Sequence, residues 1–411
     1  MPSLTNKLKS LGVQLGADKI KVPGKPTAFP CLLDIFNGSW ENTSSGDCFV
    51  IRKTFHPDYV QGNTSLFNDL DLNILEGDPS LVGISSIPLD QFLFIDTETT
   101  GLAGGAGTYV FLIGAAKYKN GKFHFAQFFL QDPAAEPAQL AALEKFCINT
   151  KVIISYNGKS FDLPRIKTRY KFNGWPPPFE DVYHLDLLHV ARRLWKSHLS
   201  SCSLGDIEHH LLGKTRSSLD IPGWKVASVF FDYLSSGDPT PLSSVFYHNE
   251  EDVISLIALL KYIIDRLSNP LSKKYLANDD LVSIGIYLAN QKLYDSGKLV
   301  LSHVIENIDL PDHLHNSALI QLASLYKKTG DYSKAVPLWE IIASRDFIQA
   351  HTELAMYYEH KRFDYQEAIH WSLSALEVIT KQSKLETREN TRQAFDHRLS
   401  RLKRKLSRLN R

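Results

Sequence analysis

The stretch Phe94-Ile95-Asp96-Thr97-Glu98-Thr99-Thr100-Gly101-Leu102 places two acids at the end of a run that begins as an apolar strand. Residues two apart in a strand point to the same side, so Asp96 and Glu98 are expected to project together. Two carboxylates on one buried face are costly unless a cation lies between them, and Mg²⁺ and Mn²⁺ prefer oxygen ligands. The alternative is that the pair caps the turn at 99–101. The stretch taken alone leaves both interpretations open.

Further strands are predicted on either side of this stretch. Tyr109–Ile113 and Phe123–Leu130 are of strand length, and Lys119-Asn120-Gly121-Lys122 joins them. Asn-Gly is the strongest short hairpin signal, because both residues tolerate positive φ. A helix over Pro137–Ile148 then leads to the apolar strand Val152–Tyr156, which is of the kind buried in a parallel sheet. The order strand, strand, strand, helix, strand is that of a ribonuclease-H-like core.

We therefore predict an α/β ribonuclease-H-like domain over residues 91–270, with a mixed five-stranded sheet and flanking helices. Residues 160–260 read mostly as helix, interrupted by proline-containing loops at 175–178 and 220–223. The segment 1–90 holds short β-prone pieces broken by Gly, Pro and Asn. It is predicted to form an irregular β-rich N-terminal arm.

A spaced self-similarity indicates helical repeats in the last third of the chain, residues 278–411. The segment 322–335 resembles 354–368, and Tyr332 and Tyr365 are 33 residues apart, close to the tetratricopeptide period of about 34. With a weaker copy before them, three repeats are predicted, about the minimum that buries a shared core. The final helix is basic, with leucines on one stripe, and either caps the repeats or, as the less favoured alternative, contacts nucleic acid.

Composition narrows the functional class. The 411 residues carry 46 Lys and Arg against 45 Asp and Glu, a net charge of +1, so any surface for a polyanion must be local. The N-terminus lacks the apolar core of a signal peptide, and no stretch approaches the roughly 18 apolar residues of a membrane span. We expect a cytoplasmic protein without membrane contact. The four cysteines have no paired spacing, which argues against a cysteine zinc site and a disulfide framework.

Three other acidic residues follow predicted elements. Asp162 comes shortly after the apolar strand, where open α/β sheets bind their ligands, although taken by itself it is better explained as a helix N-terminal residue favoured by the helix dipole. On a helix, His248 and Asp252 lie one turn apart and address the same point, although such a pair is more often a surface pair. Asp186 is a rival acid. Asp96, Glu98, Asp162 and Asp252 each stand at an element end that one sheet can bring together.

Three motifs resemble those of the DEDD superfamily of exonucleases. They are Asp96–Gly101, the segment from Asn157-Gly158 to Phe161-Asp162, and His248–Val253. The continuation Gly101–Tyr109 and the distal Ser203–Glu208 resemble the bacterial branch that joins such a nuclease to C-terminal tetratricopeptide repeats. The resemblance covers most of the chain from about Gly38 onward.

The resemblance implies a set of residue roles. Asp96 would bridge two divalent ions, Mg²⁺ or Mn²⁺. Glu98 and Asp252 would complete the shell of the first ion, and Asp162 would hold the second through water. His248 would be the base that takes the proton from the attacking water. The implied substrate-binding residues are Thr99, Thr100, Leu102 and Asn157.

One departure from the family concerns this base. Members with a tyrosine place it four residues before the final aspartate, and members with a histidine place it five before. Here His248 occupies the four-residue position and Tyr247 the five-residue position. Both remain candidates, and the ordinary pKa of histidine, about 6.5, suits proton abstraction near neutrality better than that of tyrosine, about 10.

The implied chemistry is phosphodiester hydrolysis. Two ions about 3.5–4 Å apart generate hydroxide and neutralise charge on the attacking and leaving oxygens. We expect a 3′-to-5′ exonuclease on single-stranded nucleic-acid ends, whose repeats recruit a protein partner or orient the strand. The alternatives are a catalytically silent nucleic-acid-binding scaffold and a tetratricopeptide protein-interaction adaptor. Endonuclease activity also remains an alternative. The sequence does not decide between DNA and RNA as substrate, because that choice depends on the shape of the pocket.

Overall fold

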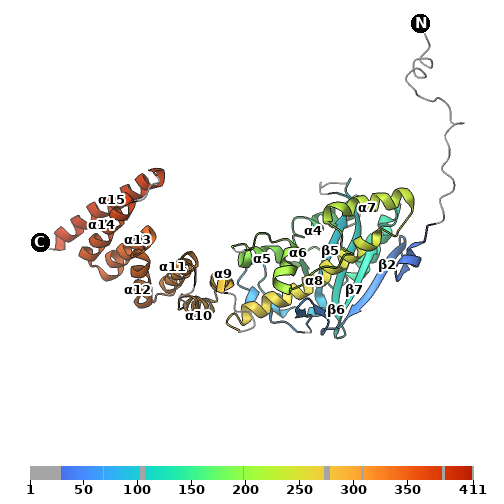
Figure 1. Cartoon of the computed structure of the whole chain (residues 1–411), viewed down its shortest axis with the longest axis horizontal. Coiled ribbons are helices and arrows are strands. Elements are labelled where there is room, and N and C mark those ends of the chain that lie inside the picture. The colour runs from blue at the N-terminus through green and yellow to red at the C-terminus, as the bar shows by residue number, and fades with distance from the viewer. Residues whose placement is uncertain are drawn as a thin grey trace, which may run out of the picture.

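The computed structural model joins an α/β domain to a row of helices that extends away from it (Figure 1). The C-terminus lies at the far end of this row. The structure describes residues 29–67, 69–101, 107–197, 199–272, 278–306, 310–381 and 385–409. Leu102, one of the predicted substrate-binding residues, lies outside the described residues.

The α/β domain is built on a mixed sheet of seven strands, not five. Their spatial order is β1 (Gly38–Thr43), β2 (Gly46–Phe55), β7 (Lys122–Phe129), β6 (Val110–Lys119), β5 (Phe92–Thr99), β8 (Val152–Ser155) and β9 (Tyr183–Asp186). The strands β5, β8 and β9 run parallel, and all other neighbours are antiparallel. A mixed sheet with flanking helices was predicted and is confirmed.

The two additional strands come from the segment predicted as an N-terminal arm. Strand β2 pairs with β7 from Phe49 opposite Phe129 to Phe55 opposite Phe123. Its residues 48–51 are buried, so pairing removes apolar surface from water. It also provides hydrogen-bond partners for the backbone groups at the edge of β7. The prediction of five strands was therefore wrong because this long-range pairing has no local signal.

The remaining short elements of the N-terminal half pack around the sheet. They are α2 (Leu32–Ile35), β3 (Val60–Gln61), β4 (Thr64–Ser65) and the 3₁₀ turns η2 (Leu72–Leu75), η3 (Ile84–Ser86), η4 (Leu89–Gln91) and η5 (Pro133–Ala135). Leu75 and Ile84 are fully buried in the core that also holds β5. In the described residues, the segment before β5 is thus part of the domain.

The hairpin between β6 and β7 forms where the sequence predicts it. Asn120 has φ of 51° and Gly121 has φ of 76°, the two positive values that a tight two-residue hairpin turn requires. The region 160–260 differs from its mostly helical prediction by containing β9. This strand is short and follows a proline-rich loop, so its sequence shows too few residues for a period of two.

The helices of the domain lie on both faces of the sheet. Their bounds are α3 (Glu136–Phe146), α4 (Asp162–Phe172), α5 (Leu187–Trp195), α6 (Leu204–Ile207) with the π turn η6 (Glu208–Leu212), α7 (Gly223–Ser236) and α8 (Leu242–Ser268). Leu93 and Ile95 of β5 pack with α3 and α4, whereas Phe92 and Phe94 pack with α5 and α8. Asp96 continues the series that faces α8.

The C-terminal region of the described chain is entirely helical, as predicted. It comprises α9 (Asn278–Asn290), α10 (Tyr294–Ile305), α11 (Asp312–Lys328), α12 (Tyr332–Ala343), α13 (Ile348–Tyr357) with the π turn η8 (Tyr358–Arg362), α14 (Tyr365–Lys381) and α15 (Leu385–Leu409). Each helix packs against its neighbours in sequence. The assignment of these helices to tetratricopeptide repeats stays a prediction. No helix in the described ranges is long and apolar enough to cross a membrane.

The basic final helix is held by one buried acid. Glu359, which is 1% exposed, pairs with Arg401 at 2.7 Å, Lys405 at 2.9 Å and Arg398 at 3.5 Å. Leu402 on the same helix is fully buried. Because three of its cations are already paired within the chain, the arrangement favours a capping role for α15 over nucleic-acid contact.

Replacing Glu359 with Gln should therefore destabilise the helical region. The three cations would lose their shared negative charge, and we expect a loss of about 1–3 kcal/mol in the free energy of unfolding, because the cations are partly exposed. Urea unfolding followed by circular dichroism measures it. As a control, Glu353→Gln breaks the more exposed pair with Lys327 and should cost less than about 1 kcal/mol. Equal losses in both variants would contradict the role of Glu359.

Candidate active site

Two carboxylates project from the end of β5 toward α8. Asp96 and Glu98 are two residues apart and share the α8 side of the strand, and Glu98 is buried. The pairing of β5 with β6 is irregular directly after Glu98, where the register shifts at Thr99. The strand therefore ends at the pair, and the carboxylates stand at the carboxyl edge of the parallel strands, where ligands bind in open α/β sheets.

Helix α8 supplies a buried amide that fixes Asp96. The Asn249 side-chain nitrogen donates to Asp96 Oδ2 at 2.9 Å and more weakly to the Asp96 carbonyl at 3.3 Å. Its oxygen accepts a hydrogen bond from Gln127 Nε2 at 3.0 Å. Gly114 lies opposite Asp96 on β6, and a Cβ there would overlap the Asn249 amide. The absent side chain of Gly114 thus makes room for the amide that positions Asp96.

The same helix presents His248 and Asp252 to this pair. His248 Nε2 lies 3.6 Å from Asp252 Oδ2 and 4.0 Å from Glu98 Oε1. The other ring nitrogen, Nδ1, lies 2.7 Å from Asp220 Oδ1. With its proton on Nδ1, the ring donates to Asp220 and leaves Nε2 able to accept a proton at the carboxylates. The Tyr247 hydroxyl instead accepts a hydrogen bond from the Ser217 backbone at 3.4 Å.

Asp162 reaches the site from the start of α4. Thr97 lies on the opposite face of β5 from Asp96, and its hydroxyl donates a hydrogen bond to the carboxylate of Asp162. Asp162 is buried, and Gly158 in the preceding loop gives it room, since a Cβ there would press on Ser155 and Asp162. Three separate segments, β5, α4 and α8, therefore bring the four predicted acids together.

The acids are close enough to perturb one another. Burial raises the pKa of Asp96 and of Glu98 well above their ordinary values, and the charges of Asp252 and Asp162 raise both pKa values further. Burial also raises the pKa of Asp162 to about 6, against the partial effect of the Thr97 hydrogen bond. Burial raises the pKa of Asp252 although Arg216 opposes the shift. Ionising all four carboxylates therefore costs free energy, and a bound cation would reduce that cost.

Arg216 is the cation that faces this set, and sequence reasoning missed it. Its guanidinium binds buried Glu208 through two hydrogen bonds of 2.6 and 2.9 Å and donates to Asp252. It also lies 3.0 Å from His248 Nδ1 and 3.6 Å from Asp220. Neither Arg216 nor Asp220 stands in a motif, so nothing in the linear sequence indicates that they meet at α8.

The site fits a divalent cation by the chemistry of its donors. Across the described ranges, no three side chains among His, Cys, Asp and Glu converge closely enough to form a finished metal site. The four carboxylates nevertheless supply only oxygen donors, and their mutual repulsion is what a hard cation such as Mg²⁺ or Mn²⁺ would relieve. Asp96, Glu98, Asp162 and Asp252 are the residues that would hold it.

Other predicted residues shape loops. The Thr99 hydroxyl donates to the Gly101 carbonyl at 3.0 Å, and the Thr100 hydroxyl accepts from the Tyr109 backbone at 2.9 Å. Asn157 has a positive φ of 65°, and its N–H donates to Asp186 at 2.7 Å. Asp186 also accepts from the backbone of Lys159 and Leu188. This rival acid therefore holds the loop after β8.

An open cavity of about 430 Å³ lies in front of Glu98 and Asp162. Trp224 and Phe161 line it and are unusually exposed for aromatic residues, at 80% and 39%. The Arg165 guanidinium lies 4.7 Å from the centre of the Phe161 ring. Exposed aromatic faces beside a cation are typical stacking platforms for unpaired bases. Neither aromatic residue was predicted to bind substrate, although Phe161 stands directly before Asp162 in the second motif.

This fold and its carboxylate site define the class of protein. Residues 93–264 match the model of the RNase_H superfamily. The chain is also 34% identical over 328 residues to "Uncharacterized protein YprB" of Bacillus subtilis (strain 168), a match that covers 77% of this chain and 76% of that protein. The chain therefore belongs to the YprB family and carries an RNase_H superfamily domain.

One solved structure is a more distant match. It is the family B DNA polymerase from the hyperthermophilic archaeon Pyrobaculum calidifontis, at 18% identity and a TM-score of 0.35. The match covers 50% of this chain and 29% of the polymerase chain. The superfamily and the carboxylate site support nuclease chemistry in general.

Gly114→Ala should disturb the site through Asn249. The added methyl would displace the amide from Asp96, and we expect a loss of about 1–3 kcal/mol in the free energy of unfolding. Chemical unfolding measures the change. As a control, Gly205→Ala adds the same methyl where no atom lies within 4 Å and should be neutral or stabilising. An unchanged stability of Gly114→Ala would refute the close approach.

Asp162→Asn should stabilise the metal-free protein at neutral pH. The folded-state pKa of Asp162 is about 6, above its ordinary 3.8, so the wild type loses stability as the pH rises between these values. The variant lacks this loss. We expect no difference near pH 4 and an advantage of up to about 3 kcal/mol above pH 6.5. Unfolding in the presence of a chelator measures it.

The control for this experiment is Asp232→Asn, which neutralises an exposed aspartate on α7. Its stability relative to the wild type should change little with pH. A difference between Asp162→Asn and the wild type that is independent of pH would contradict the buried, charged state of Asp162.

Proposed function

We propose that this protein is a divalent-metal-dependent nuclease that removes nucleotides from single-stranded nucleic-acid ends in the 3′-to-5′ direction. The observation that carries the proposal is that the charges of Asp162 and Asp252 act on Asp96 and Glu98, with His248 within 4.0 Å of Glu98 and 3.6 Å of Asp252, beside an open cavity. The direction follows from the resemblance of the three motifs to DEDD exonucleases. When bound, two Mg²⁺ or Mn²⁺ ions would supply a hydroxide nucleophile and neutralise charge on the phosphate oxygens.

The chain's own residues have distinct tasks in this proposal. His248 Nε2 accepts the proton of the attacking water, and Asp220 at Nδ1 stabilises the imidazolium that results. Arg216, anchored by Glu208, fixes the position of Asp252 through a hydrogen bond. Asn249 holds Asp96 in place.

The cavity accounts for the preference for an unpaired end. Trp224 and Phe161 present exposed ring faces next to Glu98 and Asp162. Stacking of a base on an aromatic side chain is worth about 1–3 kcal/mol and does not depend on base identity. A terminal nucleotide stacked there places its phosphodiester at the carboxylates.

A catalytically silent scaffold is the second candidate. The observation that favours it is the Arg216–Asp252 ion pair, which already engages one of the four acids. In a scaffold, this pair would replace a metal ion permanently, and nucleic acid would bind without being cleaved.

Hydrolysis separates the two candidates. The purified full chain, given Mn²⁺ or Mg²⁺ and 5′-end-labelled single-stranded DNA or RNA, should shorten the strand stepwise from its 3′ end. Chelator and Asp96→Asn should both abolish the reaction. His248→Ala should lower kcat by about 10²–10⁴-fold through loss of the base.

The matched control for the base is Tyr247→Phe, which removes only the neighbouring hydroxyl and should keep the rate within about twofold. A rate loss in Tyr247→Phe but not in His248→Ala would transfer the role of base to Tyr247. Strand binding by the wild type without hydrolysis in the presence of Mn²⁺ and of Mg²⁺ would refute the nuclease and support the scaffold.

A further inference from the structure

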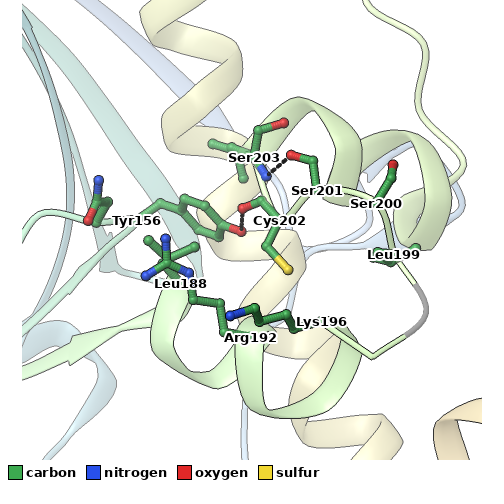
Figure 2. A pocket seen from close by; sticks show the side chains of 11 residues that line it. Tyr156, Leu188, Arg192, Lys196, Leu199, Ser200, Ser201, Cys202 and Ser203 are labelled. Carbon is green, nitrogen blue, oxygen red and sulfur yellow. Dashed lines mark hydrogen bonds between the residues drawn. The ribbon is translucent and has the colours of Figure 1, made fainter.

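A second and larger cavity lies beside the loop that carries Asp162. Its volume is about 780 Å³, and it is open to solvent and bordered by the residues that follow β8, by α5 and by the segment 199–204 (Figure 2). The Tyr156 hydroxyl reaches across to donate to the Cys202 carbonyl at 2.6 Å. Arg192 and Lys196 lie on one side of this bond in the view, and serines follow one another along the segment opposite.

The two cations make this cavity positive. Arg192 and Lys196 are one helical turn apart and both are exposed. In the part of the chain that the structure describes, neither forms an ion pair, whereas the adjacent Arg193 lies 3.6 Å from Asp78. Ser200 and Ser201 add hydroxyl groups to the lining. Unpaired cations beside hydroxyl donors suit a phosphate oxygen.

One loop connects this cavity to the candidate active site. Tyr156 and Asn157 line the positive cavity, and Phe161 and Asp162 line the cavity in front of the carboxylates. Lys159 is exposed on the loop between them, and Asp186 holds its backbone at 3.1 Å.

The sheet sets how far apart the two cavities lie. The strands β5, β8 and β9 are parallel neighbours, so their carboxyl ends share one edge at intervals of about 5 Å. The loop that begins at the cavity of Arg192 and Lys196 and ends at Asp162 therefore carries one further exposed cation, Lys159.

We propose that the cavity at Arg192 and Lys196 binds the phosphate backbone of the single strand whose 3′ end lies at the carboxylates. This inference rests on the proposed function and adds a second contact site for the same substrate. Its ligand class is the phosphodiester of an unpaired strand. The near-neutral net charge of +1 means that the whole chain supplies no general attraction, so local cations must hold the strand.

The test compares two variants that each remove two positive charges. Arg192→Ala/Lys196→Ala empties the cavity of its cations. Lys119→Ala/Lys122→Ala removes the same charge at the β6–β7 hairpin, which lies at the opposite end of β5 from the carboxylates. Fluorescence anisotropy in chelator measures binding of a labelled single-stranded 20-mer and trinucleotide without hydrolysis.

We expect the cavity variant to weaken binding of the 20-mer by about 10-fold or more, and to lower the slope of log Kd against log salt by about 1.4. The trinucleotide should lose less than the 20-mer, because it is too short to engage both sites fully. The hairpin variant should bind both like the wild type. Arg192→Lys/Lys196→Arg, which keeps the charge, should restore most of the affinity for the 20-mer.

Three results would overturn the proposal. The first is unchanged binding of the 20-mer by the cavity variant. The second is an equal loss of affinity for the 20-mer in the hairpin variant. The third is that a nucleoside monophosphate binds the wild type but not the cavity variant, while the 20-mer binds both. The failure of the proposed function is distinguishable, because wild type would then bind the 20-mer but not hydrolyse it when metal is added.

Discussion

The repulsion among four buried or half-buried carboxylates is the constraint around which the site is built. Asp96, Glu98, Asp162 and Asp252 have raised pKa values mainly because they are withdrawn from water. A buried set of this kind persists only if the surrounding structure holds it. Asn249 and Thr97 donate hydrogen bonds to it, and Arg216 opposes its charge. The same repulsion is what a bound divalent cation would relieve.

Helix α8 connects this site to the rest of the molecule. Near its start it carries His248, Asn249 and Asp252, and further along it packs under β5 in the main core. Near its end, buried Arg266 lies 3.6 Å from Asp280 at the start of α9. The main core continues from the sheet into the first C-terminal helices. The helical region is thus joined to the nuclease-like domain by buried contacts as well as by the chain.

Local patterns predicted the central elements well. The apolar strand before Asp96, the Asn120-Gly121 turn and the helix before β8 each have a signal of only a few residues. The pairing of β2 with β7 and the short strand β9 escaped prediction. Strand β2 pairs with a partner far along the chain, and β9 has only four residues, so both depend on neighbouring strands for their stability.

The sequence by itself determined the candidate acids, since two carboxylates ending an apolar strand, and an imidazole one turn from a carboxylate, are patterns of types and spacing. Only the tertiary structure decided what surrounds them. Arg216 and Trp224 lie in loops and at helix ends, where no periodicity fixes direction, so their meeting with β5 depends on how the helices pack. The positive cavity likewise exists because parallel strands bring the start of the Asp162 loop beside α5. Linear sequence records which groups are available, and packing sets the distances over which their charges act.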